Sequence, residues 1–391
     1  MSKPKIRFKG YEEDWEQRKL NDVVEFLDTM RKPLEGAKRI PGPYPYYGAS
    51  GIVDYVDGYL FDEELILLSE DGANITDRNY PVCFLASGKY WVNNHAHVLR
   101  TKQENENNFI CNSLERKDYT QYNTGMAMPK LNKETCKKIP ISCPGFEEQK
   151  KIGDYFRSLD HLITLHQRKC EETKKLKNYM LQKMFPQNGK RVPEIRFAEF
   201  TDDWEQRKLK NEAEFGKGNG YSKSDLTEFG APIILYGRLY TKYENLISDV
   251  DTFANTKDGS VYSEGGEVIV PASGETAIDI ARAATVEKAG ILLGGDLNII
   301  KPNNNIDSEF LSLSISNGNS QRELAKKAQG KSVVHIHNKE IQDLIIPFPC
   351  IEEQKNISKY FFKLDHLITL HQRKCEELQK IKKFMLQNMF I

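Results

Sequence analysis

Two segments of this 391-residue chain occur twice, and this duplication constrains the fold more than any other feature of the sequence. The segment Pro4–Leu20 returns as Pro193–Leu209, and both copies end in WEQRKL. The segment Phe146–Phe185 returns as Ile351–Phe390 with 28 of 40 positions identical, among them an unbroken LDHLITLHQRKCEE. The chain is therefore predicted to have a pseudo-two-fold internal repeat.

The segments between the repeats differ from each other. Residues 21–145 and 210–350 share little similarity, so the sequence predicts two modules of different specificity. The repeated segments that carry these modules are called the frame below. Proline, asparagine and glycine in Pro186–Pro193 mark the hinge between the halves. The expected domains and spacers are residues 1–145, 146–192, 193–350 and 351–391.

Each 40-residue repeat is predicted to form a long helix. A proline precedes each repeat, and two glutamates lie in its first turn, where carboxylates suit the positive end of the helix dipole. Apolar residues then recur at steps of four, three and four, which is typical of a coiled-coil seam. They are Ile152, Phe156, Leu159 and Ile163 in the first repeat, and Ile357, Phe361, Leu364 and Ile368 in the second. The length and identity of the repeats favour a symmetric helix pair over two ordinary core helices.

The variable segments have the pattern of short strands and loops. A strand is expected at Glu64–Ser69, followed by an Asp-Gly turn, and another at Glu267–Pro271. The run APIILYGRLYT contains a further short strand. Because helical periodicity is sparse there, we expect the fold class of each module to be α+β.

Charge and cysteine usage bound the functional class. The formal net charge is zero, so any nucleic-acid binding must rest on local patches or on partner subunits. Residues 146–192 hold 11 basic and 6 acidic side chains, whereas residues 193–350 hold 17 and 24. The seven cysteines form no CxxC motif, and the chain starts with no apolar signal segment, so we expect a cytoplasmic protein with reduced thiols and no membrane span.

Motifs for catalysis or cofactor binding are incomplete. Gly330-Lys331-Ser332 resembles the end of a phosphate-binding loop, but the glycine that the loop requires is replaced by Ala325. The run Gly216–Gly220 lacks the GxGxxG spacing, and no GxSxG occurs. Two histidine pairs could each share one face of a strand but lack further metal ligands nearby in sequence, namely His95 with His97 and His335 with His337. We therefore expect no catalytic residue, no metal site and no cofactor in this chain.

Polar and aromatic loops offer side chains suited to contacts with DNA phosphates and base edges, because asparagine pairs with adenine and arginine with guanine. The candidates in the first module are Tyr44, Tyr46, Tyr47, Ser50, Asn74, Arg78, Asn93 and Asn94. The candidates in the second module are Lys217, Asn219, Tyr221, Ser222, Lys223, Arg238, Tyr240 and Thr241. Such loops also occur on sugar- and protein-binding surfaces, several tyrosines could belong to the core, and Asn74 could cap a local structure.

Each half of the chain consists of a lead segment (Pro4–Leu20 or Pro193–Leu209), a variable module and a long helix, in that order. With this order used twice, the chain resembles, over nearly its whole length, the specificity (S) subunit of type I restriction-modification systems. WEQRKL opens each half, and a proline, EEQ and a long helix close it. The first module adds YPYYGASGIVDYVDGYLFDEELILLSEDGAN and WVNNHAHVL.

This resemblance implies two α+β target-recognition domains that read a split double-stranded DNA site and are separated by two long antiparallel helices. It also implies two methyltransferase (M) subunits, which carry S-adenosylmethionine and methylate adenine, and restriction (R) subunits, which use ATP and Mg²⁺. The chain contains no DPPY- or NPPF-like motif of its own.

Two other classes remain open from the residues alone. One is the DNA-reading module of a self-contained methyltransferase or nuclease, which a methyl-transfer assay on the isolated chain would reveal. The other is a coiled-coil scaffold that binds protein or sugar, which a gel shift with the reconstituted complex would separate.

Overall fold

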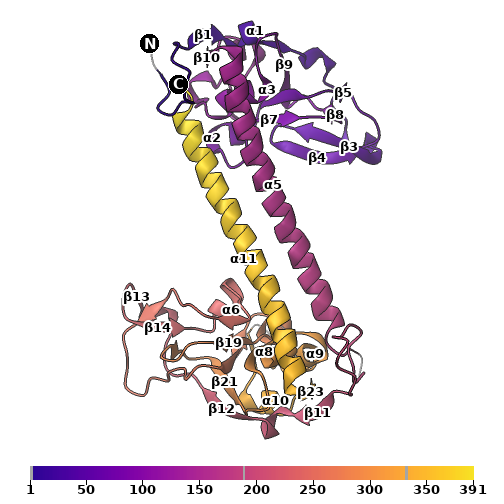
Figure 1. The fold of residues 1–391 in the computed structure, drawn as a ribbon, viewed down its shortest axis with the longest axis vertical. Helices are drawn as coiled ribbons and strands as arrows, with labels where there is room; N and C mark the ends of the chain where they lie inside the picture. Colours follow the sequence, from indigo (N-terminus) through magenta and orange to yellow (C-terminus); the bar gives the residue numbers. More distant parts are fainter. Residues whose placement is uncertain (1–2, 188–189, 331–332) are drawn as a thin grey trace. The chain divides into compact units, whose positions relative to one another are not determined.

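The computed structural model describes residues 3–187, 190–330 and 333–391. The chain forms two compact units, residues 1–168 with 372–391 and residues 169–371. Two long helices, α5 (Phe146–Lys183) and α11 (Ile351–Asn388), contribute one part to each unit (Figure 1). Each unit therefore combines one variable segment, the first part of one repeat helix and the second part of the other. The four-part domain division expected from the sequence stays a prediction.

The first unit is built mainly from short strands. Its strands are β1 (Glu16–Lys19), β2 (Val24–Phe26), β3 (Pro41–Gly48), β4 (Gly51–Val56), β5 (Phe61–Asp62), β6 (Leu65–Ser69), β7 (Cys83–Ala86), β8 (Lys89–Val92), β9 (Ala96–Thr101) and β10 (Pro140–Cys143). Its shorter helices are α1 (Leu20–Val23), α2 (Asn74–Asp77), α3 (Asn107–Glu115) and α4 (Lys133–Cys136). The strands form sheets in the orders β2-β9-β6-β7, β4-β3-β8-β5 and β1-β10.

The second unit has the same kind of architecture with a different sheet plan. Its strands are β11 (Glu205–Lys208), β12 (Ala213–Lys217), β13 (Leu226–Thr227), β14 (Ala231–Ile234), β15 (Leu246–Ile247), β16 (Phe253–Ala254), β17 (Glu267–Pro271), β18 (Ser273–Gly274), β19 (Ala284–Val286), β20 (Leu292–Leu293), β21 (Leu297–Pro302), β22 (Val334–His335) and β23 (Ile345–Phe348). Its shorter helices are α6 (Arg238–Thr241), α7 (Ala277–Ile280), α8 (Ser308–Ser316), α9 (Gly318–Lys327) and α10 (Asn338–Gln342). The sheet orders are β12-β21-β17-β19-β15, β13-β16-β14-β20, β18-β22 and β11-β23.

The strands expected at the two apolar runs are confirmed as β6 and β17, and a third as β14. Every residue of β6 and of β17 is buried. Successive side chains of a strand point to opposite faces, so such a strand separates two cores. Ile66 and Leu68 join the core that contains α3, whereas Leu65 and Leu67 join the core around β8. The α+β class is confirmed for both units.

The repeat helices pack on the units as well as on each other. Ile152 and Phe156 of the predicted seam are fully buried in the core of the first unit, together with Phe109 of α3. Ile357 and Phe361 occupy the corresponding core of the second unit. The apolar stripe that indicates a coiled coil thus also attaches each helix to a variable module.

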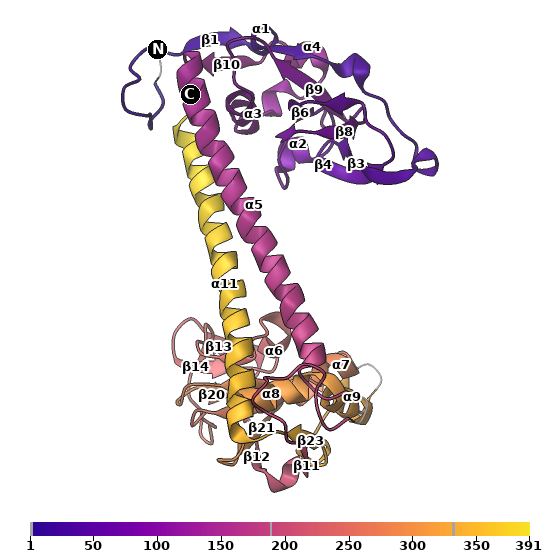
Figure 2. The same cartoon turned by 45° about the vertical axis from the view of Figure 1, so that its right-hand side comes forward.

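Within each unit, α5 and α11 lie side by side and run in opposite directions (Figure 2). In the first unit, Lys382 of α11 donates to Asp160 of α5 over 2.6 Å. In the second unit, Lys177 of α5 donates to Asp365 of α11 over 2.5 Å. Lys177 and Asp365 are the counterparts of Lys382 and Asp160 in the other repeat, so the same ion pair forms once in each unit. The antiparallel arrangement is confirmed within each unit.

The lead segment is held to the repeat helix by a buried ion pair in each unit. Arg7 donates from Nε to Glu148 over 2.7 Å, and Arg196 donates from Nε to Glu353 over the same distance. Glu148 and Glu353 are 3% and 0% exposed. Two hydrogen bonds join each guanidinium to its carboxylate, which gives the frame a defined geometry.

The residues that follow each repeat helix pack into the core of the unit in which the other repeat helix begins. Phe390, after α11, packs on Trp15 and Phe109 in the first unit. Phe185, after α5, packs on Trp204 and Phe310 in the second. The two aromatic clusters are again equivalent, so the internal repeat extends from the sequence to the packing of the frame.

Candidate nucleic-acid interface

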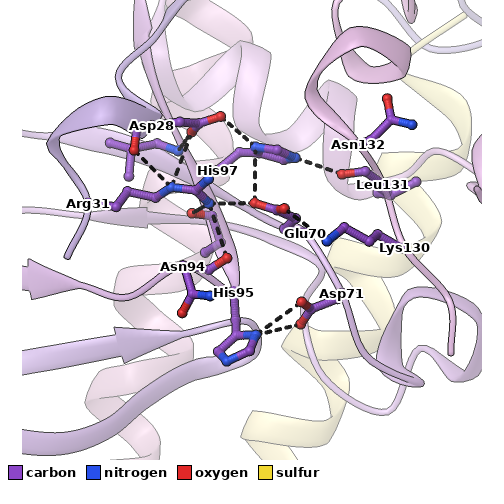
Figure 3. Close-up of polar contacts among 12 residues, drawn as sticks. Asp28, Arg31, Glu70, Asp71, Asn94, His95, His97, Lys130, Leu131 and Asn132 are labelled. Carbon is purple, nitrogen blue, oxygen red and sulfur yellow. Dashed lines mark hydrogen bonds and ion pairs between the residues drawn. The ribbon is translucent and has the colours of Figure 1, made fainter. Parts of the chain in front are cut away.

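A buried charged network lies beneath one surface of the first unit (Figure 3). His97, on β9, is 1% exposed. Its Nδ1 lies 2.8 Å from Asp28 Oδ2, and its Nε2 lies 2.7 Å from the carbonyl oxygen of Leu131. Both neighbours are acceptors, so both ring nitrogens donate and the imidazole is positively charged.

Protonation of His97 follows from its partners. Burial by itself lowers the pKa of His97, but the hydrogen bonds to Asp28 and Cys136 and the charge of Asp28 raise the pKa to about 10. Burial likewise raises the pKa of Asp28, but the hydrogen bond and charge of His97 outweigh burial and lower that pKa below its ordinary value. The pair therefore stays charged at neutral pH.

Arg31 extends the network to the next strand. Its Nη1 donates to Glu70 Oε2 over 2.6 Å and to the carbonyl oxygen of Ala96 over 2.7 Å. Lys130 Nζ lies 3.4 Å from Glu70 Oε1. These contacts join the end of β6, the start of β9 and residues 130–131 into one rigid platform.

At the surface of this platform, His95 Nδ1 lies 2.8 Å from Asp71 Oδ1 (Figure 3). The His95 side chain is 51% exposed, in contrast to buried His97. His95 lies in the turn before β9 and not in the strand, so the two histidines do not share a strand face: one is exposed and the other is buried. Among the described residues, no group of three or more histidine, cysteine or acidic side chains could hold a metal ion.

The tyrosine-rich hairpin β3–β4 presents few of its predicted DNA-binding side chains to solvent. Tyr46 is 1% exposed, and its hydroxyl accepts a hydrogen bond from the Leu34 amide. Tyr47 is half-buried against the apolar cluster around β8, and Tyr44 is half-buried as well. Ser50, in the turn, is exposed. Tyr46 and Tyr47 therefore have clear packing roles, and their contact with DNA stays a prediction.

Asn74 stabilises a local loop, which is close to the capping role considered as an alternative in the sequence. Its Oδ1 accepts a hydrogen bond from the Tyr80 amide over 2.8 Å, and its Nδ2 donates to the Tyr80 carbonyl over 3.0 Å. Arg78, at the end of α2, pairs with Glu115 over 3.3 Å. Both residues stabilise the loop that follows α2, and their contact with DNA stays a prediction.

Asn93 and Asn94 lie in the turn between β8 and β9. Asn93 is 6% exposed, and its Oδ1 accepts a hydrogen bond from the His95 amide. Asn94 is exposed beside His95. The Asn93 amide donates to the Tyr47 carbonyl over 3.0 Å, so this turn and the end of β3 lie together. Of the first-module candidates, the structure brings together this turn and the β3–β4 turn.

In the second unit, five candidates lie at the end of β12 and in the loop that follows it. Asn219 is exposed and donates to the Gly259 carbonyl over 2.5 Å. Tyr221 is 5% exposed, and its hydroxyl lies 2.6 Å from Ser260 Oγ. The other candidates of this group are exposed, namely Lys217, Ser222 and Lys223.

Lys257, in the segment after β16, contacts this loop, and its Nζ donates to the Gly220 carbonyl over 3.3 Å. Its Nζ donates to Asp225 over 2.5 Å and lies 4.8 Å from the centre of the Tyr221 ring. The hydrogen bond from Lys257, together with those from Ser222, lowers the pKa of Asp225 to about 2. Lys257 is not among the candidates from the sequence, because its partner Asp225 is distant along the chain.

Arg238 is enclosed by acidic partners. It is 9% exposed, and its guanidinium donates to Asp251 over 2.7 Å and to Glu244 over 2.8 Å. A guanine would have to compete with these two carboxylates. Contact between Arg238 and DNA stays a prediction that requires the ion pairs to break.

Two further candidates flank Arg238. The Tyr240 hydroxyl donates to the Ser273 carbonyl over 2.7 Å, and burial raises the pKa of Tyr240. Thr241 is exposed, and its hydroxyl donates to the Gly237 carbonyl over 3.1 Å. Of this group, only Thr241 lies openly on the surface.

The family model of the type I restriction modification DNA specificity domain matches residues 12–175 and 201–380, which is most of the chain and one match for each half. The chain belongs to this family. Its members are the non-catalytic DNA-recognition components of type I restriction-modification systems, and this chain is such a specificity subunit.

Individual relatives agree with the family. The chain is 24% identical to the type I restriction enzyme MjaVIII specificity subunit of Methanocaldococcus jannaschii, over 95% of this chain and 91% of that protein. It is 35% identical to a protein named as a type I restriction enzyme specificity subunit of Haemophilus influenzae, over 40% of this chain and 39% of that protein. The crystal structure of a type I restriction-modification S subunit from M. genitalium shares the fold, with a TM-score of 0.69, 14% identity and coverage of 100% of this chain and 99% of that one.

None of the helices in the described part of the chain is long and apolar enough to cross a membrane.

Proposed function

We propose that each variable segment reads one part of a split double-stranded DNA target, and that the repeat helices carry the partner subunits. The observation that supports this most is the contrast between frame and modules. The frame forms the same contacts twice, as in Arg7–Glu148 and Arg196–Glu353, whereas the sheets of the two modules differ in strand number and order. A constant frame with two different surfaces suits recognition of two different half-sites.

The helices offer equivalent apolar side chains to partners. In the first unit, Leu162 and Phe384 are 40% and 56% exposed. In the second unit, their counterparts Leu367 and Tyr179 are 41% and 50% exposed. A duplicated apolar surface fits two copies of one partner, which we take to be two M subunits.

The partners would supply the chemistry. M subunits would carry S-adenosylmethionine and methylate adenine within the target, and R subunits would add ATP- and Mg²⁺-dependent cleavage, all in the bacterial cytoplasm. The role of this chain is to position them on DNA. Its zero net charge supports a shared interface, because partner subunits must then provide much of the positive charge for the phosphates.

Methylation mapping of the complex tests the proposal. The chain is co-produced with the M subunits of its system in a methylation-free host, and modified adenines are located across the genome by sequencing. We expect one motif with two defined parts separated by unspecified bases. A single uninterrupted motif, or no methylation beyond that of M subunits alone, would contradict the proposal.

A further inference from the structure

An exposed apolar tip stands on the platform described above. Residues 123–131 form a loop between the 3-10 helix Thr120–Tyr122 and α4, which we call the methionine loop. Met126 at its tip is fully exposed and Met128 is 60% exposed. Two large apolar side chains in solvent are costly for an isolated protein and often mark a contact surface.

The methionine loop is rigid within itself. The side-chain oxygen of Asn123 accepts hydrogen bonds from the amides of Gly125 and Lys130, each over 2.9 Å. The Thr124 amide donates to the Lys130 carbonyl over 2.8 Å. A Cβ atom at Gly125 would lie 1.8 Å from the carbonyl oxygen of Met128, so this tight turn requires glycine.

The base of the loop is fixed to the charged platform. The Leu131 amide donates to the Glu70 carbonyl over 2.7 Å, and the Gly72 amide donates to the Pro129 carbonyl over 3.0 Å. Buried His97 donates to the carbonyl of Leu131 (Figure 3). The methionines are thus presented at the end of an anchored support, as a side chain that enters a partner must be.

The second variable segment has a glycine at the equivalent place in its sequence. Gly330 precedes α11 by as many residues as Gly125 precedes α5. A Cβ atom at Gly330 would lie 1.9 Å from the carbonyl oxygen of Val333, which is 50% exposed. In both modules, a glycine at this place is followed three residues later by an exposed apolar residue, Met128 in the first and Val333 in the second.

The charges around the loop favour a nucleic acid as the partner. Residues 123–138 hold four lysines and one glutamate. The nearby acidic groups are already paired, Asp71 with His95 and Glu70 with Arg31 and Lys130. An apolar tip within a basic surface fits DNA, whose phosphates flank an apolar base stack, better than it fits an apolar protein groove.

We propose that Met126 and Met128 form a wedge that enters the minor groove and partly separates one base step in the half-site of the first unit. Architectural DNA-binding proteins use methionine, leucine and similar side chains in this way. The proposal rests on the proposed function and adds a positioning role to it. The wedge would select flexible base steps, and so add specificity without hydrogen bonds to bases.

The test uses the complex of the full chain with its M subunits. The probe is a duplex of the mapped target in which 2-aminopurine, whose fluorescence rises when it unstacks, replaces one base at a time along the first half-site. The variants are Met126→Ala with Met128→Ala, and the matched control Met126→Leu with Met128→Leu, which keeps apolar side chains of similar size. Binding affinity and fluorescence are both measured.

We expect the original complex and the leucine control to unstack one base step. The alanine variant should lose that signal and bind the target about tenfold more weakly, with its binding to random DNA unchanged. Original affinity and fluorescence in the alanine variant would overturn the wedge. Failure of the alanine variant to assemble with M subunits would also overturn it, because the tip would then contact protein. If the original complex showed no target preference at all, the proposed function itself would fail.

Discussion

Asp160 and Lys382 form an ion pair of 2.6 Å in the first unit, and their counterparts Asp365 and Lys177 form the same pair in the second. A local contact that recurs at equivalent positions shows that the duplicated sequence is used as a duplicated structure. The same holds for the buried pairs Arg7–Glu148 and Arg196–Glu353. These paired contacts give direct predictions for stability.

Removing one partner of a buried pair should destabilise its unit. Arg196→Ala leaves the fully buried carboxylate of Glu353 without its cation, so the free energy of unfolding should fall by about 3 kcal/mol. The matched control is Arg207→Ala, because Arg207 pairs closely with the exposed Glu205 and only loosely, at 3.6 Å, with Glu212, so its loss should cost less than about 1 kcal/mol. Urea unfolding measures both, and equal losses would show that the buried pair has no special role.

The stability of the first unit should depend on pH through His97. The folded-state pKa of His97 is raised to about 10 from an ordinary value of 6.5, so its stabilising effect is complete below pH 6.5 and disappears as the pH rises through about 10. Thermal unfolding between pH 6.5 and 10 should therefore show a falling melting temperature. The neutral variant His97→Gln should be less stable at pH 6.5 and show a weaker pH dependence, since other groups titrate in both proteins. Parallel curves for the two proteins would contradict a charged His97.

A buried and an exposed aromatic residue of the two repeats should separate effects on stability from effects on assembly. Phe185→Ala empties a 3%-exposed position between Trp204 and Phe310 and should cost about 3 kcal/mol or more. Phe384→Ala changes a 56%-exposed side chain and should alter stability by less than about 0.5 kcal/mol. The second variant should instead weaken binding of an M subunit, measured by analytical ultracentrifugation. Unimpaired assembly of Phe384→Ala would remove this residue from the partner surface.

The isolated chain should transfer no methyl groups. Purified chain is incubated with DNA and radiolabelled S-adenosylmethionine, and the complex with M subunits serves as the positive control. We expect label in DNA only with the complex. Methylation by the chain alone would reveal a catalytic site that the family assignment does not provide.

The frame could be predicted from the sequence because its determinants are local and repeated. The apolar stripe of Ile152, Phe156, Leu159 and Ile163 indicates one helical face, and the prolines and glutamates before it indicate where each helix begins. The structure places those starts at Phe146 and Ile351, directly after the predicted boundaries. Buried strands such as β6 were equally clear, since a continuous apolar run leaves few alternatives.

The orientation of individual loop side chains could not be predicted in the same way. Tyr46 and Arg238 have residue types common on recognition surfaces, yet contacts with residues elsewhere in the chain bury both. The partner of Tyr46 is the Leu34 amide, and those of Arg238 are Asp251 and Glu244. Such partners follow from the tertiary fold and not from spacing along the chain. Met126 is not among the candidates from the sequence, because an apolar residue in a loop gives no signal of its exposure, which only the structure shows.

Exchange of one variable segment tests the central claim most directly. Residues 21–145 are replaced by the corresponding segment of a relative with a known target, while the lead segments, both repeat helices and residues 210–350 are kept. Methylated sites are then mapped for the original and the exchanged complex. We predict that one part of the split target changes to that of the relative and that the other part stays as it was. A change in both parts, or in neither, would contradict the account of two independent reading modules on one duplicated frame.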